Sequence, residues 1–264
     1  MHKSTRACIS SRFDRYNIFF ELWFKNCLNY NFDIVIFLDG KVQTIIDRIA
    51  ELNIQTHKVS VIEVQQYGNI YKIDNLKFFK NIFDVVYFDM GYDAIIYTDP
   101  DELLLVNDFN LFLNCSDNVL VSKGFEMVQH KNENEYSLNK KFLDQRNYGF
   151  WSEQSYNPSH AFYNKMCVFK KHNYPTNVGR HASHHSFKPT QIENEFIFLI
   201  HLREICKKTT IHNAKENIAK YQKNHNQHSF YSEKDLDHWL DAWFYPYSVE
   251  IPFEIKNLIT KHDL

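Results

Sequence analysis

The chain has 264 residues, 44% of them hydrophobic and 16% aromatic, enough to bury a sizeable core in one large domain or a domain with a small appendage. Its 30 Lys and Arg nearly balance its 32 Asp and Glu, for a formal net charge of -2. This balance excludes the uniformly positive surface typical of nucleic-acid-binding proteins, so we expect no nucleic-acid partner.

The cysteines are scattered, and no two of them have the C-x-x-C spacing; they are Cys8, Cys27, Cys115, Cys167 and Cys206. This distribution is typical of buried thiols in a reducing compartment. Residues 1–6 lack the pattern of a signal peptide, and no run of about 18 apolar residues occurs. We therefore expect a cytoplasmic protein without a transmembrane segment.

Short apolar runs alternate with longer amphipathic runs through the first hundred residues. This alternation is typical of βαβ units and a largely parallel sheet. The pattern predicts strands over residues 6–10, 33–38, 57–64 and 92–98, and helices over residues 13–29, 42–52 and 75–88.

The later part of the chain has a less regular pattern. It predicts strands over residues 118–122, 166–169 and 196–200, with a polar exposed loop over residues 130–141. The last sixty residues read as helical, with Trp239 and Trp243 one turn apart. Packing in a core is the default interpretation of such aromatics, and acceptor binding and peripheral membrane contact are the alternatives.

Polar residues follow several of the predicted strands. Ser10 and Arg12 come at the end of the first, Asp39 follows the second, and Asp99 and Asp101 follow the fourth. In open α/β sheets, ligands bind outside the carboxyl ends of the strands, where loops and helix N-termini converge. The sequence therefore predicts a binding site at this edge of the sheet.

The acidic segment D-P-D-E at residues 99–102 allows two interpretations, a polar turn or a cation site. Pro100 favours a bend, which lets the carboxylates of Asp99 and Asp101 converge. Carboxylate oxygens suit Mg²⁺ or Mn²⁺, and an ion with few protein ligands takes the others from substrate phosphates and water. The cation interpretation therefore implies a phosphorylated substrate.

Histidines and basic residues supply the remaining candidates. His181 and His201 are predicted at element boundaries beside basic residues, where a histidine can complete a Mn²⁺ shell, bind phosphate or act as acid or base. Arg12, Lys165 and Arg203 are candidates for holding a diphosphate, with a surface charge as the alternative for each.

Several well-known motifs are absent from the sequence. It contains no G-x-S-x-G nucleophile elbow, no Walker A loop and no G-x-G-x-x-G fingerprint. The histidine-rich loop has no H-E-x-x-H frame and no cysteine pair that would favour zinc. These absences exclude the easily recognised hydrolases, NTPases and dehydrogenases.

An ordered set of short segments resembles bacterial and viral glycosyltransferases of the family 2 type with the GT-A fold. The segments are D-P-D-E-L at 99–103, similar to the D-x-D-E-F of that family, G-F-E-M at 124–127, Gln145, Gly149, Y-N-K at 163–165, G-R-H at 179–181 and L-I-H-L at 199–202. Together they cover about residues 6–205.

The resemblance implies an α/β fold that is GT-A-like, with a Rossmann-type, mixed and mostly parallel sheet flanked by helices and a helical C-terminal extension. Residues 1–205 would form the catalytic domain that binds the nucleotide sugar and the acceptor. Residues 206–264 would form the extension.

The activity implied is transfer of a sugar from a nucleotide-diphosphate donor, a UDP-sugar, to a glycan, lipid or protein acceptor. Ser10, Arg12 and Asp39 would surround the nucleotide, and Lys165 and Arg203 would bind its diphosphate. Asp99 would lie near the ribose or on the metal. A Mn²⁺ or Mg²⁺ ion would be held by four side chains: Asp99, Asp101, His181 and His201.

Asp144 and Glu153 are the candidates for a catalytic base, which an inverting enzyme needs to deprotonate the acceptor hydroxyl. Each could instead be a solvated surface acid. Two other functions use the same residues: a metal-dependent phosphate-ester hydrolase or nucleotidyltransferase, and a catalytically inactive sugar-binding module.

Overall fold

The computed structural model describes most of the chain. The described residues are 5–40, 42–64, 75–108, 113, 119–151, 165–170, 172–175, 197–212, 215, 234, 237–238, 240–241, 245, 248–262 and 264. Trp239 and Trp243 lie outside them, so the alternatives for these aromatics stay as predicted.

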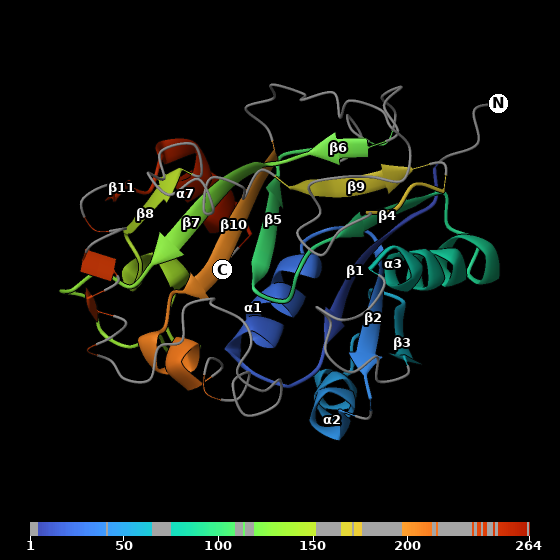
Figure 1. Ribbon diagram of the computed structural model, residues 1–264, viewed down its shortest axis with the longest axis horizontal. Helices are drawn as coiled ribbons and strands as arrows, with labels where there is room; N and C mark the ends of the chain where they lie inside the picture. The colour runs from blue at the N-terminus through green and yellow to red at the C-terminus, as the bar shows by residue number, and fades with distance from the viewer. Residues whose placement is uncertain are drawn as a thin grey trace. The chain divides into compact units, whose positions relative to one another are not determined.

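The first hundred residues alternate strands and helices, as the sequence predicts (Figure 1). The elements are β1 (Ala7–Phe13), α1 (Ile18–Cys27), β2 (Asp33–Asp39), α2 (Gln43–Leu52), β3 (Val59–Val64), α3 (Asn75–Asp84), the π-helical turn η1 (Val85–Asp89) and β4 (Ala94–Tyr97). The prediction that the first helix starts at Phe13 is wrong. Phe13 belongs to β1, and α1 starts after Asn17, whose side chain accepts hydrogen bonds from the backbone N–H groups of Phe19 and Phe20.

The second part of the chain contains more strands than the sequence predicts. The elements are β5 (Glu102–Val106), β6 (Val119–Val121), β7 (Lys123–Val128), the 3₁₀ turn η2 (Phe142–Asp144), β8 (Tyr148–Trp151), β9 (Met166–Lys170), β10 (Ile197–Glu204), β11 (Val249–Glu250) and α7 (Phe253–Lys261). The prediction had β6, β9 and the start of β10, but not β5, β7 or β8. The C-terminal part is helical in α7 and also contributes strand β11.

The first sheet has the strand order β3-β2-β1-β4-β9-β6. Its pairings from β3 through β2 and β1 to β4 are parallel, and β9 pairs antiparallel with both β4 and β6. The prediction of a mixed, mostly parallel sheet flanked by helices is therefore confirmed. A second sheet has the order β11-β8-β7-β10-β5, in which β8 is antiparallel to β7 and β11.

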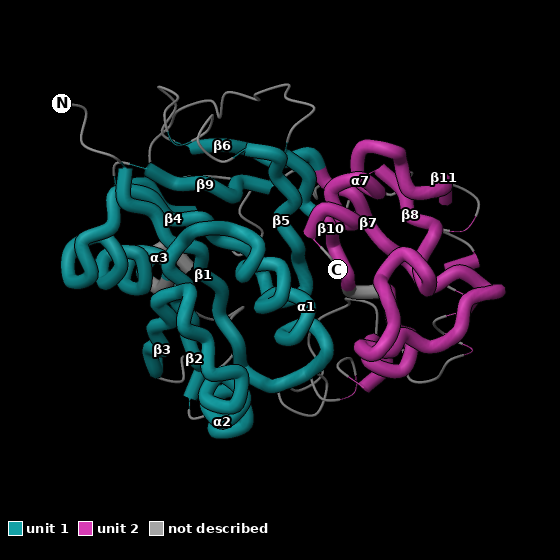
Figure 2. Tube along the Cα trace, turned by 180° about the vertical axis from the view of Figure 1, so that it is seen from behind, with its two compact units in different colours: residues 1–123, 164–199 teal, residues 124–163, 200–264 magenta. Residues whose placement is uncertain are grey.

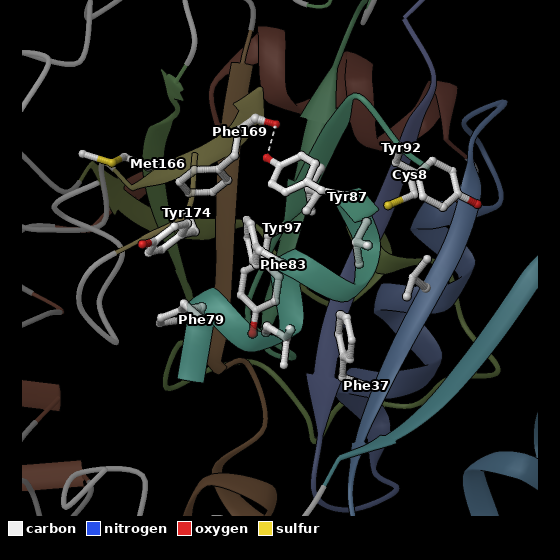
Figure 3. Packing of buried hydrophobic residues seen from close by; sticks show 14 of the residues in the cluster. Cys8, Phe37, Phe79, Phe83, Tyr87, Tyr92, Tyr97, Met166, Phe169 and Tyr174 are labelled. Carbon is white, nitrogen blue, oxygen red and sulfur yellow. Dashed lines mark hydrogen bonds between the residues drawn. The ribbon is translucent and has the colours of Figure 1, made fainter. Parts of the chain in front are cut away.

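Alternate residues of β1 pack on opposite faces of the first sheet. Cys8 belongs to an apolar cluster with Phe79 and Phe83 of α3, and this cluster also takes in residues of β2, β4 and β9 (Figure 3). On the other face, Phe13 makes edge-on ring contacts with Phe20 and Trp23 of α1, both at 5.2 Å between centroids. Because side chains alternate along a strand, Ser10 and Arg12 share the face of Cys8.

The chain divides into two compact units (Figure 2). The first contains residues 1–123 and 164–199, and the second contains residues 124–163 and 200–264. This division by spatial contact interleaves the two units along the chain. The predicted boundary between a catalytic domain, 1–205, and an extension, 206–264, concerns their roles and stays a prediction.

The cysteines within the described ranges are free and buried: Cys8, Cys27, Cys167 and Cys206. Burial raises the pKa of the Cys8 and Cys27 thiols well above the ordinary range, so neither is poised to react as a thiolate. Among the described helices, none is both long and apolar enough to span a bilayer.

Candidate functional site

The first sheet has a topological switch point between β1 and β4. From β1, the strands β2 and β3 extend the sheet on one side, and β4 starts the other side. All these pairings are parallel, so the carboxyl ends of the strands share one edge, which is the usual ligand site of such sheets. The backbone N–H of Thr98 donates to the Ser10 carbonyl oxygen there, at 3.2 Å.

An ion pair joins β1 to β2 at this edge. Arg12 pairs in register with Phe37, which puts it near Asp39 on the same face of the sheet. Its guanidinium Nη2 bonds to Asp39 Oδ2, and the two side chains are only 9% and 7% exposed. Directly after Asp39, Gly40 takes a φ of +81°, a backbone conformation that glycine adopts without strain.

The second carboxylate oxygen of Asp39, Oδ1, is buried and has no hydrogen-bond partner within the described part of the chain. The same holds for the hydroxyls of Ser10 and Ser11, both of which are fully buried. Leaving a buried polar group unsatisfied costs about 1–3 kcal/mol. Native proteins keep few such groups, and a bound ligand is one reason to keep them.

Two acids after β4, Asp99 and Glu102, contact the same lysine, Lys165. Lys165, which directly precedes β9, places its Nζ 3.1 Å from Asp99 Oδ2 and 2.6 Å from Glu102 Oε1. Glu102 is fully buried, and its Oε2 accepts a hydrogen bond from the Asp99 backbone N–H at 2.8 Å. The segment thus contains the turn that the sequence allows, and its buried acid already faces a cation, the Lys165 ammonium.

Neighbouring contacts fix the shape of this turn. The indole Nε1–H of Trp23 donates to Thr98 Oγ1 at 2.7 Å, which ties the end of β4 to α1. The backbone N–H of Glu102 donates to the Asp99 carbonyl oxygen at 3.1 Å, across Pro100 and Asp101. Since β5 begins at Glu102 and is buried throughout, the acid at this position is enclosed by the fold while one of its oxygens caps the turn at the Asp99 N–H.

The residues predicted to bind the metal are brought together only in part. Asp99 and Asp101 share the turn after β4, and each is partly exposed. Their carboxylate oxygens suit a Mg²⁺ or Mn²⁺ ion that takes further ligands from phosphates and water. No group of three His, Cys, Asp or Glu that could hold a metal occurs among the residues described. His181 lies outside those residues.

His201 lies inside β10 and not at its end, because the strand continues to Glu204. The expectation that this histidine stands at an element boundary is therefore wrong. Its Nδ1 lies 2.6 Å from Oε1 of Glu126 on β7, and both side chains are buried in the second unit. Glu126 Oε2 is buried without a hydrogen-bond partner in the described part of the chain. The role of His201 as a metal ligand stays a prediction.

The structure describes the surroundings of only one of the two candidate bases, and it does not describe the side chain of Arg203. Asp144 is exposed in the turn η2, which belongs to the second unit. Glu153 is outside the described residues, and Arg203 lies on β10 with a side chain that is not described. Their roles stay predictions.

Sequence reasoning missed the buried partnership of Glu102 with Lys165 and that of Glu126 with His201. A signal for Glu102 was present, since it directly precedes the apolar run L-L-L-V at 103–106, which is strand β5. An acid at the start of a buried strand needs a cation nearby. The sequence alone does not say which lysine or arginine supplies that cation.

Comparisons with known proteins give only distant similarities. No protein-family model matches the sequence, and no curated protein matches it. The glycosyltransferase GlyE from Streptococcus pneumoniae TIGR4 is similar over 46% of this chain and 30% of its own, with 16% identity and a TM-score of 0.31.

Two further solved structures are similar at the same level. The mannosyltransferase Ktr4p from S. cerevisiae in complex with GDP has 12% identity over 50% of this chain and 41% of its own, with a TM-score of 0.31. S. aureus TarS has 9% identity over 90% of this chain and 43% of its own, with a TM-score of 0.40. The chain spans less than half the length of each of these three proteins. At this level of similarity, the contacts of the site itself have to carry the functional argument.

Proposed function

We propose that this protein is a glycosyltransferase that moves a sugar from a nucleotide-diphosphate donor to a glycan, lipid or protein acceptor, with a Mn²⁺ or Mg²⁺ ion. The observation that carries the proposal is the set of buried polar groups at the switch point of the first sheet. Ser10 Oγ and Asp39 Oδ1 lie on one face there, without partners among the described residues and beside the Arg12 guanidinium. Such a set suits a ligand that offers both hydrogen-bond donors and acceptors, as a nucleoside does.

The chemistry of each residue follows from its contacts. Asp39 Oδ1 can accept an N–H from a nucleobase, and Ser10 Oγ can donate to or accept from the nucleoside. Arg12 holds the Asp39 carboxylate in place through the other oxygen. We expect a UDP-sugar as donor, since uracil presents one such N–H between two carbonyl acceptors.

The diphosphate would lie toward the turn after β4, where Lys165 supplies a positive charge. A divalent ion held by Asp99 and Asp101 would add positive charge that stabilises the departing nucleoside diphosphate. We propose His181 and His201 as further ligands of the ion and Arg203 as a second cation for the diphosphate. Asp144 or Glu153 is the proposed base.

We assign the reaction to residues 1–205, with residues 206–264 as an extension. We propose the cytoplasm as the location of the protein, in keeping with its buried free cysteines.

The test is calorimetric titration with UDP, GDP, CDP and ADP, with and without Mn²⁺, followed by assays of donor hydrolysis and transfer. We expect UDP to bind, more tightly with Mn²⁺, and Asp101→Asn to lose most of the metal effect. Asp84→Asn on the last turn of α3, where Asp84 pairs with Lys80, is the matched control. Absence of nucleotide binding, or cleavage of simple phosphate esters by the wild-type protein, would refute the proposal.

A further inference from the structure

Lys165 has two carboxylate partners that differ in burial. Glu102 is fully buried, and both of its oxygens are engaged, one by Lys165 Nζ at 2.6 Å and the other by the Asp99 backbone N–H at 2.8 Å. Removing the cation from a buried carboxylate leaves an uncompensated charge, which is strongly destabilising. The ammonium is therefore anchored on Glu102.

The second contact of the ammonium is weaker and closer to solvent. Lys165 Nζ lies 3.1 Å from Asp99 Oδ2, and the Asp99 side chain is 27% exposed, against 0% for Glu102. A pair that reaches solvent contributes little to stability, because water can replace either partner. Of the two contacts, the one to Asp99 is the one that opens at low cost.

The charges of the segment favour a divalent ion as the replacement. Asp99, Asp101 and Glu102 bring three negative charges against the single positive charge of Lys165, a balance of -2 among these four side chains. Like charges held close together repel unless a cation lies between them. A divalent cation that replaced Lys165 at Asp99 would bring more positive charge to these carboxylates than the ammonium does.

We infer that Lys165 is a resident counter-ion of Asp99 that a divalent cation displaces, while its ammonium stays on Glu102 beside the donor diphosphate. This inference rests on the proposed function and adds to it how the binding of the metal depends on the binding of the donor. Before the donor arrives, Lys165 opposes metal binding, because the ion must take Asp99 from it and lies near its positive charge. The diphosphate reverses this effect, because its negative charges attract the ammonium and the ion together, so donor and metal bind cooperatively.

A charge-balanced double variant tests the exchange. Glu102→Gln with Lys165→Met removes the ammonium and the buried acid together, so the net charge stays the same and no buried charge is left unpaired. Calorimetric titration with Mn²⁺ alone should show binding at least about tenfold tighter than in the wild-type protein, because the competing cation is gone. With Mn²⁺ present, UDP should bind about tenfold more weakly, because the diphosphate has lost a cation.

The matched control is Lys80→Met with Asp84→Asn, which removes an ion pair of α3 and, like the site variant, leaves the net charge unaltered. It should leave both affinities unchanged. Equal Mn²⁺ affinity in the wild-type protein and the site variant, or no Mn²⁺ binding by either, would overturn the inference. Failure of the proposed function has a different signature, the absence of nucleotide binding to the wild-type protein.

A second variant covers the case in which the double variant does not fold. Lys165→Arg keeps the charge, and the guanidinium fork can grip both carboxylates more firmly than an ammonium does. We expect its affinity for Mn²⁺ alone to fall several-fold. An unchanged or higher affinity would count against displacement of the residue at 165 by the metal.

Discussion

Two buried arginines, one in each compact unit, show different uses of a buried charge. Arg146 in the second unit is fully buried, and its hydrogen bonds go to backbone carbonyl oxygens, with the Glu133 carboxylate farther away, at 3.9 Å from Nη1. Its Nε lies 2.7 Å from the Ile205 oxygen, its Nη1 lies 3.0 Å from the Asn134 oxygen, and the group lies over the Tyr136 ring at 5.5 Å. Burial lowers the pKa of Arg146, so these bonds have to hold the charge in place.

Arg12 in the first unit instead donates a hydrogen bond to a carboxylate, and that carboxylate keeps one oxygen, Oδ1 of Asp39, without a partner among the described residues. By bonding to these carbonyl groups, Arg146 joins the segment 130–147 to the end of β10. Arg12 lies at the end of a strand, and the hydroxyl of Ser10 on the same strand also has no partner among the described residues. A buried charge surrounded by fixed acceptors stabilises the fold. One beside an unsatisfied acceptor at the switch point of a sheet is the part of the molecule that we propose as a binding site.

The largest expected effect is on the stability of the second unit. Arg146→Met should lower the free energy of unfolding by about 3–5 kcal/mol, because it leaves several carbonyl oxygens unsatisfied. Urea denaturation measures this, and the exposed pair partner Lys131, changed to Met, is the control that should shift stability by less than about 1 kcal/mol. A small effect at Arg146 would remove the distinction between the two arginines.

The next effect is a pH dependence of stability in the second unit. Burial, with a smaller contribution from Lys261, lowers the pKa of His262 from its ordinary 6.5 to about 4. Between these values the unfolded state binds more protons than the folded state, so stability should fall as pH falls from about 6.5 to about 4, by at most about 3 kcal/mol.

Unfolding by urea at several pH values measures this dependence. The slope of the unfolding free energy against pH should be smaller in His262→Asn than in the wild-type protein. The same change at the exposed His238 should leave this slope unaltered. An equal slope in all three proteins would show that the interior of this unit accepts the charged imidazole.

A third effect should appear in binding at the first unit. Asp39→Asn keeps the shape of the side chain but removes the charge that Arg12 faces and replaces one acceptor by a donor. We expect UDP affinity to fall at least about tenfold, or about 1.4 kcal/mol, by calorimetry. Unchanged affinity in a folded variant would show that the unsatisfied oxygen has no part in binding.

The smallest effect separates two buried serines. Ser10→Ala removes a hydroxyl without a partner among the described residues, so stability should stay equal or rise by up to about 1 kcal/mol, while UDP binding weakens several-fold. Ser122 is the matched control, because its Oγ donates to the Lys165 carbonyl oxygen at 3.0 Å. Ser122→Ala should lose about 1 kcal/mol of stability. Loss of stability in both would contradict the assignment of Ser10 to a ligand.

The first hundred residues were the most predictable part of the fold. Their strands and helices follow each other with clear periods, and only local rules are needed, such as the cap at Asn17 that moves the start of α1. The strands β7 (K-G-F-E-M-V) and β8 (Y-G-F-W) were missed because each is short and interrupted by glycine, so neither has a clear period of its own. Their identity as strands depends on pairing with each other across the polar segment 130–147.

The common sheet edge of the candidate site residues was predictable from the sequence, but their pairings were not. Ser10, Arg12, Asp39 and Asp99 follow from the rule for strand ends, and the register of β1 with β2 and β4 confirms that they share one edge. The rule does not say that Asp39 takes Arg12 or that Lys165 lies between Asp99 and Glu102. These partners are 27 to 66 residues apart, beyond the reach of any local pattern.

The sequence by itself determined the α/β class, the succession of the first four strands along the chain and the edge of the sheet where polar residues gather, because hydrophobic periodicity and turn chemistry are local properties of a chain. Tertiary structure decided which charges are buried, which cation faces each acid and which polar atoms keep no protein partner. Burial depends on the segments that come to cover a residue, and the electrostatic character of Glu102, Arg146 and Lys165 is set by neighbours that lie far away along the chain.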